Sequence, residues 1–151
     1  MKPEDRKQIA IGGMYAVTLI ASAAALMYIA LVGGNPYHAG PAAAFDKDGA
    51  RRTTFHRGDW MYVRRNVCLD RDIYAEQSPS LYDVDRHAYI ALRGAATLAK
   101  AGCAIRSSAF EVPPTLPPGD YEYRNVSRFQ NNLVGRDESN VYPPIRITVT
   151  E

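Results

Sequence analysis

An uncharged run of 24 residues, Ile9 to Val32, most constrains what this chain can fold into. At about 1.5 Å per residue, a helix over this run is roughly 36 Å long, which exceeds a hydrocarbon core of about 30 Å. A modest tilt accommodates the difference. We therefore predict a transmembrane helix over residues 9–32, preceded by a short segment at residues 1–8.

The charges that flank this run are asymmetric. Lys2, Arg6 and Lys7 precede it, whereas residues 33–45 contain no Lys, Arg, Asp or Glu. By the positive-inside rule, residues 1–8 are expected in the cytoplasm. The rest of the chain is then expected on the other side of the membrane, in the periplasm or outside the cell.

A cleaved signal peptide is the alternative interpretation of the same run. The basic residues resemble a signal-peptide n-region, and residues 21–23 (Ala-Ser-Ala) resemble a cleavage site. However, residues 26–32 continue the apolar segment without a polar region, which favours a retained anchor. Either outcome keeps most of the remaining chain.

Small residues recur at a spacing of four within the predicted helix. Gly12 pairs with Ala16 in this pattern, and Ala21 pairs with Ala25. Such pairs allow a second membrane helix to approach closely. An unpaired anchor is the alternative, since Ala and Gly are common in membrane helices.

The region after the helix divides into a predicted linker and one domain. Residues 33–50 are rich in Gly, Pro and Ala, which predicts a flexible linker. Residues 51–151 contain short alternating runs typical of strands. We expect strands over residues 59–68, 86–92, 103–112, 120–126 and 145–149, whereas residues 94–102 fit either a short helix or a crossover. About seven short strands favour an all-β, immunoglobulin-like sandwich.

The strand over residues 59–68 shows the clearest alternation. Met61, Val63 and Val67 are expected to point inward, toward the core. Arg65 interrupts this inward face, so we expect a bulge there or the exposed end of the strand.

The two cysteines of the chain, Cys68 and Cys103, are 35 residues apart in the sequence. An oxidising compartment would allow them to pair, and loop closure would then contribute up to about 4 kcal/mol of stability. The alternative is two unpaired cysteines that pack as small apolar residues. Neither belongs to a CxxC pair, which argues against zinc.

Residues of the types that are common at protein interfaces occur on the predicted outward faces of the strands. The candidate binding residues are Trp60, Tyr62, Arg64, Tyr89 and Arg93. The alternative is an ordinary solvent-facing sheet surface, where Tyr and Arg are also frequent. We predict a protein partner for this surface.

Other function classes are disfavoured. From Gly34 onward the chain has 15 Lys plus Arg against 14 Asp plus Glu, so it lacks the basic excess that nucleic-acid binding requires. No nucleophile elbow, zinc-protease or phosphate-loop motif is present, and we predict a non-enzymatic protein without a cofactor. Asp83, Asp85 and His87 have a spacing that would allow metal binding on a strand, but solvated turn residues explain it better, and no metal is predicted.

The segment LPPGDYEYR, from Leu116 to Arg124, resembles the turn and following strand of fibronectin-type and immunoglobulin-like domains. The resemblance implies that Tyr121 is the corner tyrosine, whose hydroxyl binds the backbone a few residues upstream.

The chain also resembles small single-pass membrane proteins that bacteriophages and prophages encode. The resemblance rests on the sequences GDWMYVRRNVC (58–68), Gly102-Cys103, FEVPPTLPPGDYEYR (110–124) and PPIRITV (143–149). It implies a location in a bacterial inner membrane and a role in envelope interference, superinfection exclusion or lysis support. The expected function is a membrane-anchored periplasmic protein-binding module, and the alternative is an accessory subunit of a larger membrane assembly.

Overall fold

The computed structural model describes residues 3–31, 35–130 and 137–151. Helix α1 (Pro3–Leu31) and the strands belong to two separate compact units. Within α1, the 19 residues Ile11–Ile29 are apolar and exposed, and this stretch is long enough to cross a bilayer. A signal sequence passes the same test of length and composition, so both interpretations of the run stay open. Lys2 and Val32 lie outside the described residues.

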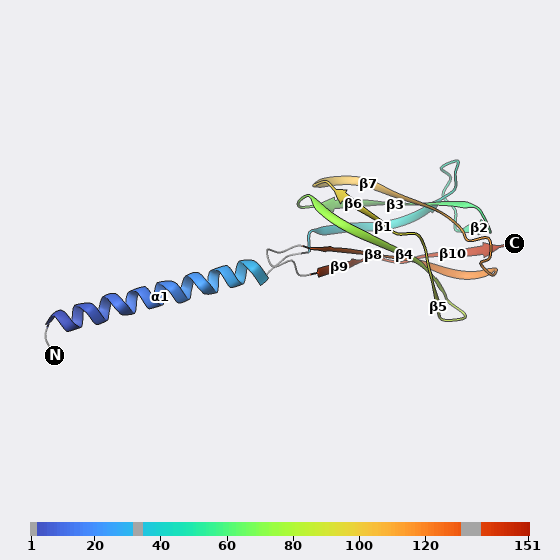
Figure 1. Cartoon of the computed structure of the whole chain (residues 1–151). Coiled ribbons are helices and arrows are strands. Elements are labelled where there is room, and N and C mark those ends of the chain that lie inside the picture. Colours follow the sequence, from blue (N-terminus) through green and yellow to red (C-terminus); the bar gives the residue numbers. More distant parts are fainter. Residues whose placement is uncertain (1–2, 32–34, 131–136) are drawn as a thin grey trace. The chain divides into compact units, whose positions relative to one another are not determined.

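The strands form two sheets (Figure 1). The small sheet has the order β1 (Tyr37–Phe45), β3 (Trp60–Leu69), β7 (Gly102–Glu111). The large sheet has the order β2 (Thr54–His56), β10 (Ile145–Thr150), β8 (Gly119–Gln130), β4 (Ile73–Asp83), β5 (Ala88–Ala91). Two further strands pair with its central strands: β6 (Ala95–Ala99) pairs with β4, and β9 (Asp137–Val141) pairs with β8. Among these strands, β2 and β10 are parallel and the other pairs are antiparallel.

The two longest strands, β4 and β8, form the centre of the large sheet. They pair with each other over residues 75–83 and 121–129. On its other side, β8 pairs first with β10 and then with β9. The far side of β4 pairs with β5 near its end and with β6 near its start. The large sheet is therefore five strands wide, although seven strands build it.

The two sheets pack face to face, because inward side chains of both enter common clusters. The first cluster consists of Ala44, Phe55, Met61, Val63, Leu81, Phe110, Val112, Leu116, Tyr121, Tyr123, Ile147 and Val149. The second consists of Tyr37, Val67, Leu69, Ile73, Ala75, Ala99, Phe129 and Tyr142. Burial of apolar surface in these clusters is the main force that holds the sheets together.

Two aromatic pairs connect the sheets, one in each cluster. Phe110 of the small sheet stacks on Tyr123 of the large sheet, with ring centroids 5.1 Å apart. Tyr37 of the small sheet contacts Phe129 of the large sheet at 5.0 Å. Such pairs contribute beyond their buried area. The core is therefore divided into two parts, each with its own bridge between the sheets.

Tyr121 lies at the start of β8, where the chain enters the large sheet. Its ring is 1% exposed, and its hydroxyl donates a 2.7 Å hydrogen bond to the Pro117 carbonyl oxygen. This is the upstream backbone contact that the resemblance to immunoglobulin-like domains implied. The bond satisfies the one polar atom of a buried ring and thereby makes its burial favourable.

The predicted linker over residues 33–50 is wrong for residues 37–45, which form β1 and pair with β3. Gly40 and Pro41 suggested a linker, but they fall where the register shifts between Ala39 and Ala42. Proline lacks a backbone N–H and is tolerated at such an irregularity in an edge strand.

Several other strands differ from the sequence-based expectation. Residues 94–102, predicted as a helix or a crossover, contain the strand β6. The strands β2, β4 and β9 were not predicted. In β4, Pro79 interrupts the strand pattern, yet it lies where β5 has ended and β6 has not begun, so the missing N–H costs no bond on that side.

The expectation for Arg65 is confirmed in part. Arg65 lies in the middle of β3 and pairs regularly with β7, but the pairing of β3 with β1 shifts register between Val67 and Arg65. Its side chain points inward and is only 8% exposed. The inward face of β3 therefore carries a buried positive charge between Val63 and Val67.

The close approach of residue 94 to β4 generates a prediction of stability. A Cβ atom on Gly94 would collide with the backbone carbonyl oxygen of Gln77. We expect Gly94→Ala to lower the free energy of unfolding by about 1–3 kcal/mol, because a backbone atom cannot move aside easily. Chemical denaturation followed by fluorescence measures this change.

Gly40→Ala is the matched control, because its Cβ would lie at an ordinary 3.6 Å from the Asn66 carbonyl oxygen. It should change the stability by less than about 0.5 kcal/mol. Equal effects of the two substitutions would contradict the packing of Gly94 against β4.

Candidate functional site

The structure does not bring the five predicted binding residues together. Trp60, Tyr62 and Arg64 lie on the outward surface of the small sheet, on β3. Tyr89 lies on the outward surface of the large sheet, on β5, and Arg93 follows that strand as an exposed residue. The two groups therefore occupy opposite outer surfaces, and one flat partner surface cannot contact both.

A compact aromatic and charged cluster surrounds Tyr89. The Tyr82 and Tyr89 rings lie 4.8 Å apart, and the Arg124 guanidinium lies 4.0 Å from the centre of the Tyr82 ring. Arg124 also donates a hydrogen bond to the Tyr89 hydroxyl and a 2.7 Å bond to the Glu122 carboxylate. We call Tyr82, Tyr89, Glu122 and Arg124 the tyrosine–arginine cluster. Three of its four residues were not among the predicted site residues.

The ion pair within this cluster shifts the titration of both partners. The hydrogen bond from Arg124 lowers the pKa of Glu122, and the same bond raises the pKa of Arg124. Both groups are therefore charged at neutral pH. Because Arg124 is held by the pair and by two rings, its side chain has less freedom to lose when a partner binds.

Exposed apolar side chains continue the same outward surface. Tyr74 and Leu98 are cross-strand neighbours on β4 and β6, and they are 62% and 54% exposed. Val141 on β9 is 70% exposed and lies beside Val126 of β8. The outward surface of the large sheet thus combines tyrosine, arginine and aliphatic side chains, a composition found at protein interfaces.

A cavity of about 230 Å³ lies between the two sheets. It is lined by Tyr37, Val63, Arg65, Val67, Gln77, Thr97, Ala99, Arg106, Ser107, Ser108, Tyr123, Asn125 and Tyr142. These residues come from both sheets and from both core clusters. The cavity therefore separates the two parts of the core, and Arg65 lies where they would otherwise join.

Three polar side chains of the cavity wall, Tyr37, Gln77 and Asn125, belong to a connected network that also includes Ser127. Asn125 donates a 3.0 Å bond to Gln77, and Gln77 donates a 2.7 Å bond to Ser127. The Ser127 hydroxyl in turn donates a 3.1 Å bond to the Tyr37 hydroxyl. Such a network holds the orientation of the polar groups that belong to it.

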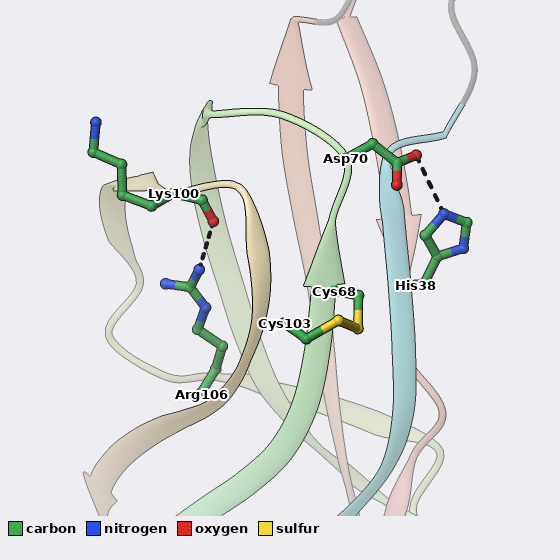
Figure 2. The surroundings of a disulfide bond; sticks show 6 residues. All are labelled: His38, Cys68, Asp70, Lys100, Cys103 and Arg106. Atoms are coloured by element: carbon green, nitrogen blue, oxygen red, sulfur yellow. Dashed lines mark hydrogen bonds and ion pairs between the residues drawn. A yellow bond between two sulfur atoms is a disulfide. The ribbon is translucent and has the colours of Figure 1, made fainter.

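Cys68 and Cys103 form the disulfide that the sequence analysis expected. They face each other in the pairing of β3 with β7, so the bond joins neighbouring strands of the small sheet (Figure 2). The immunoglobulin pattern, by contrast, bridges the two sheets. Beside the disulfide, Asp70 pairs with His38, and Arg106 on β7 donates a 3.0 Å bond to the Lys100 carbonyl oxygen.

The residues considered for a metal, Asp83, Asp85 and His87, lie at the turn between β4 and β5. The Asp83 carboxylate accepts bonds from the backbone N–H groups of Asp85 and Arg86, which lower the pKa of Asp83. The His87 ring instead contacts the Tyr82 hydroxyl. In the described part of the chain, no group of three His, Cys, Asp or Glu residues could hold a metal ion.

The four small residues considered for helix packing, Gly12, Ala16, Ala21 and Ala25, are exposed on α1. A Cβ on Gly12 would meet no atom within 4 Å. Their surface is therefore open to a second helix, although the described chain provides none.

Comparisons with known proteins show similarity of fold only. No family model matches the sequence, and no curated protein matches it. The C-terminal domain of Wzt superposes with a TM-score of 0.55 at 15% identity, over 80% of this chain and 77% of that domain. A Niemann-Pick type C2 protein from the Japanese carpenter ant superposes with a TM-score of 0.50 at 11% identity, over 78% of this chain and 96% of that protein.

The disulfide generates a prediction of stability and local dynamics. Replacing both cysteines, Cys68→Ala with Cys103→Ala, should lower the free energy of unfolding by about 2–4 kcal/mol. Because β7 pairs only with β3 within its sheet, its amide hydrogens should also exchange faster. Hydrogen exchange with mass spectrometry measures this, with the central strand β8 as the internal control. Unchanged exchange in β7 would contradict the structural role of the bond.

Burial of Tyr123 predicts a loss of stability at high pH. Removal from water raises the pKa of the Tyr123 hydroxyl from 10.0 to about 12. Between these values the unfolded chain releases a proton that the folded chain retains, so stability is complete below about pH 10 and falls by up to about 3 kcal/mol toward pH 12. Urea unfolding at increasing pH measures the decline. Tyr123→Phe should reduce its slope, and an unchanged slope would refute the assignment to Tyr123.

Proposed function

We propose that this protein is a non-enzymatic, membrane-tethered protein-binding module. In this proposal α1 is a retained anchor in a bacterial inner membrane, with residues 1–8 in the cytoplasm. The two sheets form an immunoglobulin-like domain in the periplasm. The apolar length of α1, the basic residues before it and the disulfide, which suits an oxidising compartment, support this arrangement.

The observation that carries the proposal is the tyrosine–arginine cluster on the outward surface of the large sheet. Tyrosine and arginine dominate the binding energy of many interfaces, because they bury a large area and still form hydrogen bonds. Here Arg124 is already oriented by Glu122 and by the Tyr82 ring. Exposed Tyr74, Leu98 and Val141 extend the surface with apolar contacts.

The partner in this proposal is another protein of the bacterial envelope or of a phage. The resemblance to phage and prophage membrane proteins supports a role in envelope interference, superinfection exclusion or lysis support. A membrane tether favours such a role, because it confines the domain to the surface where an envelope partner resides and so raises the effective concentration.

Substitutions on the two opposite outer surfaces test which one binds. Cells carrying the tagged full-length chain are crosslinked, and partners recovered in mild detergent are quantified by mass spectrometry. We expect Tyr89→Ala to reduce recovery of the specific partner at least tenfold, about 1.4 kcal/mol, because it removes a ring and a hydroxyl from the cluster. Tyr62→Ala, on the outward surface of the small sheet, is the matched control and should leave recovery unchanged.

Two outcomes would contradict this assignment. Equal recovery with Tyr89→Ala and the unsubstituted chain would exclude the cluster as the contact. Loss with Tyr62→Ala alone would place the contact on the small sheet.

The alternative function is an accessory subunit of a membrane assembly, in which α1 makes the main contacts. The exposed small residues Gly12 and Ala16 favour it, because they allow close helix packing. In the same crosslinking experiment, Gly12→Leu would then abolish recovery of a fixed set of membrane proteins, whereas Tyr89→Ala would not.

A further inference from the structure

Arg65 places a positive charge inside the domain without a negative partner among the described residues. Its side chain is 8% exposed and lies on the inward face of β3 between the apolar residues Val63 and Val67. Arginine remains protonated in proteins, even though burial lowers the pKa of Arg65. A buried charge is costly unless it is paired and hydrogen-bonded, so the contacts of the Arg65 guanidinium determine the cost of its burial.

The protein satisfies only part of the Arg65 guanidinium. The group lies 4.3 Å from the centre of the Tyr142 ring, and Nη2 donates a long 3.5 Å bond to the Pro143 carbonyl oxygen. The buried Nη1 has no hydrogen-bond partner within residues 35–130 and 137–151. Arg65 therefore presents a free pair of donor hydrogens inside the domain.

A second arginine, Arg106, adds to the positive charge and to the unsatisfied hydrogen-bond donors at this place. Arg106 on β7 is the direct cross-strand partner of Arg65, so both side chains leave the same face of the small sheet. The Arg106 Nη2 donates to the Lys100 carbonyl oxygen (Figure 2). Its buried Nε has no partner among the described residues. Like charges directly opposite each other on a sheet destabilise it.

None of the described residues that line the cavity carries a negative charge. The lining contains two arginines, and its other members are neutral side chains. The network of Asn125, Gln77, Ser127 and Tyr37 contributes amide and hydroxyl groups only. An anion in the cavity would supply both the missing charge and the missing acceptors.

Asn125 lacks a hydrogen-bond donor, whereas the two arginines lack acceptors. Its side-chain nitrogen donates to Gln77, but its buried Oδ1 accepts no hydrogen bond from the part of the chain that the structure describes. An ionised carboxylate or phosphate offers only acceptors, so the same ligand needs a donor such as a hydroxyl group to satisfy this oxygen. A ligand that satisfies all of these groups therefore carries an anionic group near the arginines and a hydroxyl group near Asn125.

The size and position of the cavity fit a small ligand with access from solvent. Its volume of about 230 Å³ is below the roughly 300–1,000 Å³ of pockets that hold drug-sized molecules. The lining residues Thr97 on β6 and Ser107 and Ser108 on β7 are exposed. Both strands are outermost in their sheets, so the cavity is reached between these two edges.

We propose that this cavity binds a small hydroxylated organic anion, with its carboxylate or phosphate on Arg65 and Arg106 and a hydroxyl donating to Asn125 Oδ1. The planar guanidinium fork matches either oxyanion, and the bond is stronger because it forms away from water. This binding site lies inside the domain, whereas the proposed protein contact lies on its outward surface. The two can therefore be tested independently.

The test is calorimetric titration of the full-length protein in detergent with glucuronate, glucose 6-phosphate and glucose. We expect one of the two anions to bind and neutral glucose to bind at least about tenfold more weakly. Arg65→Met, which keeps much of the side-chain volume, should weaken anion binding by about tenfold to a hundredfold, as expected for a hydrogen bond to a charged group. The comparison of glucuronate with glucose 6-phosphate identifies the acidic group.

Arg64→Met is the matched control, because Arg64 directly precedes Arg65 in the chain but points outward, over the Phe45 ring. It should leave anion binding unchanged. Should Arg65→Met fail to fold, the half-buried Arg106→Gln replaces it and should also weaken binding. The proposal is overturned if neither anion binds the folded protein, if glucose binds as tightly as the anions, or if a folded variant of Arg65 or Arg106 binds as tightly as the unsubstituted chain.

Discussion

The rest of the domain depends on the two aromatic bridges between its sheets. Phe110 stacks on Tyr123 in one part of the core, and Tyr37 contacts Phe129 in the other. The small sheet contributes one ring to each pair and the large sheet the other, so the bridges set where the sheets face each other. Between the two aromatic bridges, Arg65 interrupts the apolar core. A cavity can persist there because packed side chains support the sheets on both sides of it.

This arrangement separates two possible binding surfaces by chemistry as well as by position. The outward surface of the large sheet offers exposed rings and an arginine already paired with Glu122, which suits a broad contact with a protein. The interior offers arginines without a paired acid, which suits a small charged molecule. The disulfide holds β7 in register with β3 and so keeps Arg106 opposite Arg65.

The sequence predicted some strands well and missed others for identifiable reasons. Strands β3 and β10 alternate between apolar and polar residues, and this alternation is visible in the sequence because one face of each is buried. The strand β1 was missed because Gly40 and Pro41 are typical of loops, although here they occupy an irregularity of an edge strand. The strand β9, with the sequence DESNV, has almost no apolar pattern and exists because β8 provides a pairing edge.

The sequence alone determined the apolar helix and the predominance of β-structure, because both follow from local composition and periodicity. It also allowed Cys68 and Cys103 to pair, but it left two unpaired cysteines as the alternative, and the structure decided for the disulfide. Only the tertiary structure decided which residues share a surface. Residues 62 and 89 look equivalent along the chain, yet they lie on opposite sides of the sandwich. Arg65 looks like an interruption of a strand, and only the packing of two sheets around it makes it a buried charge, because burial depends on residues far away in the sequence.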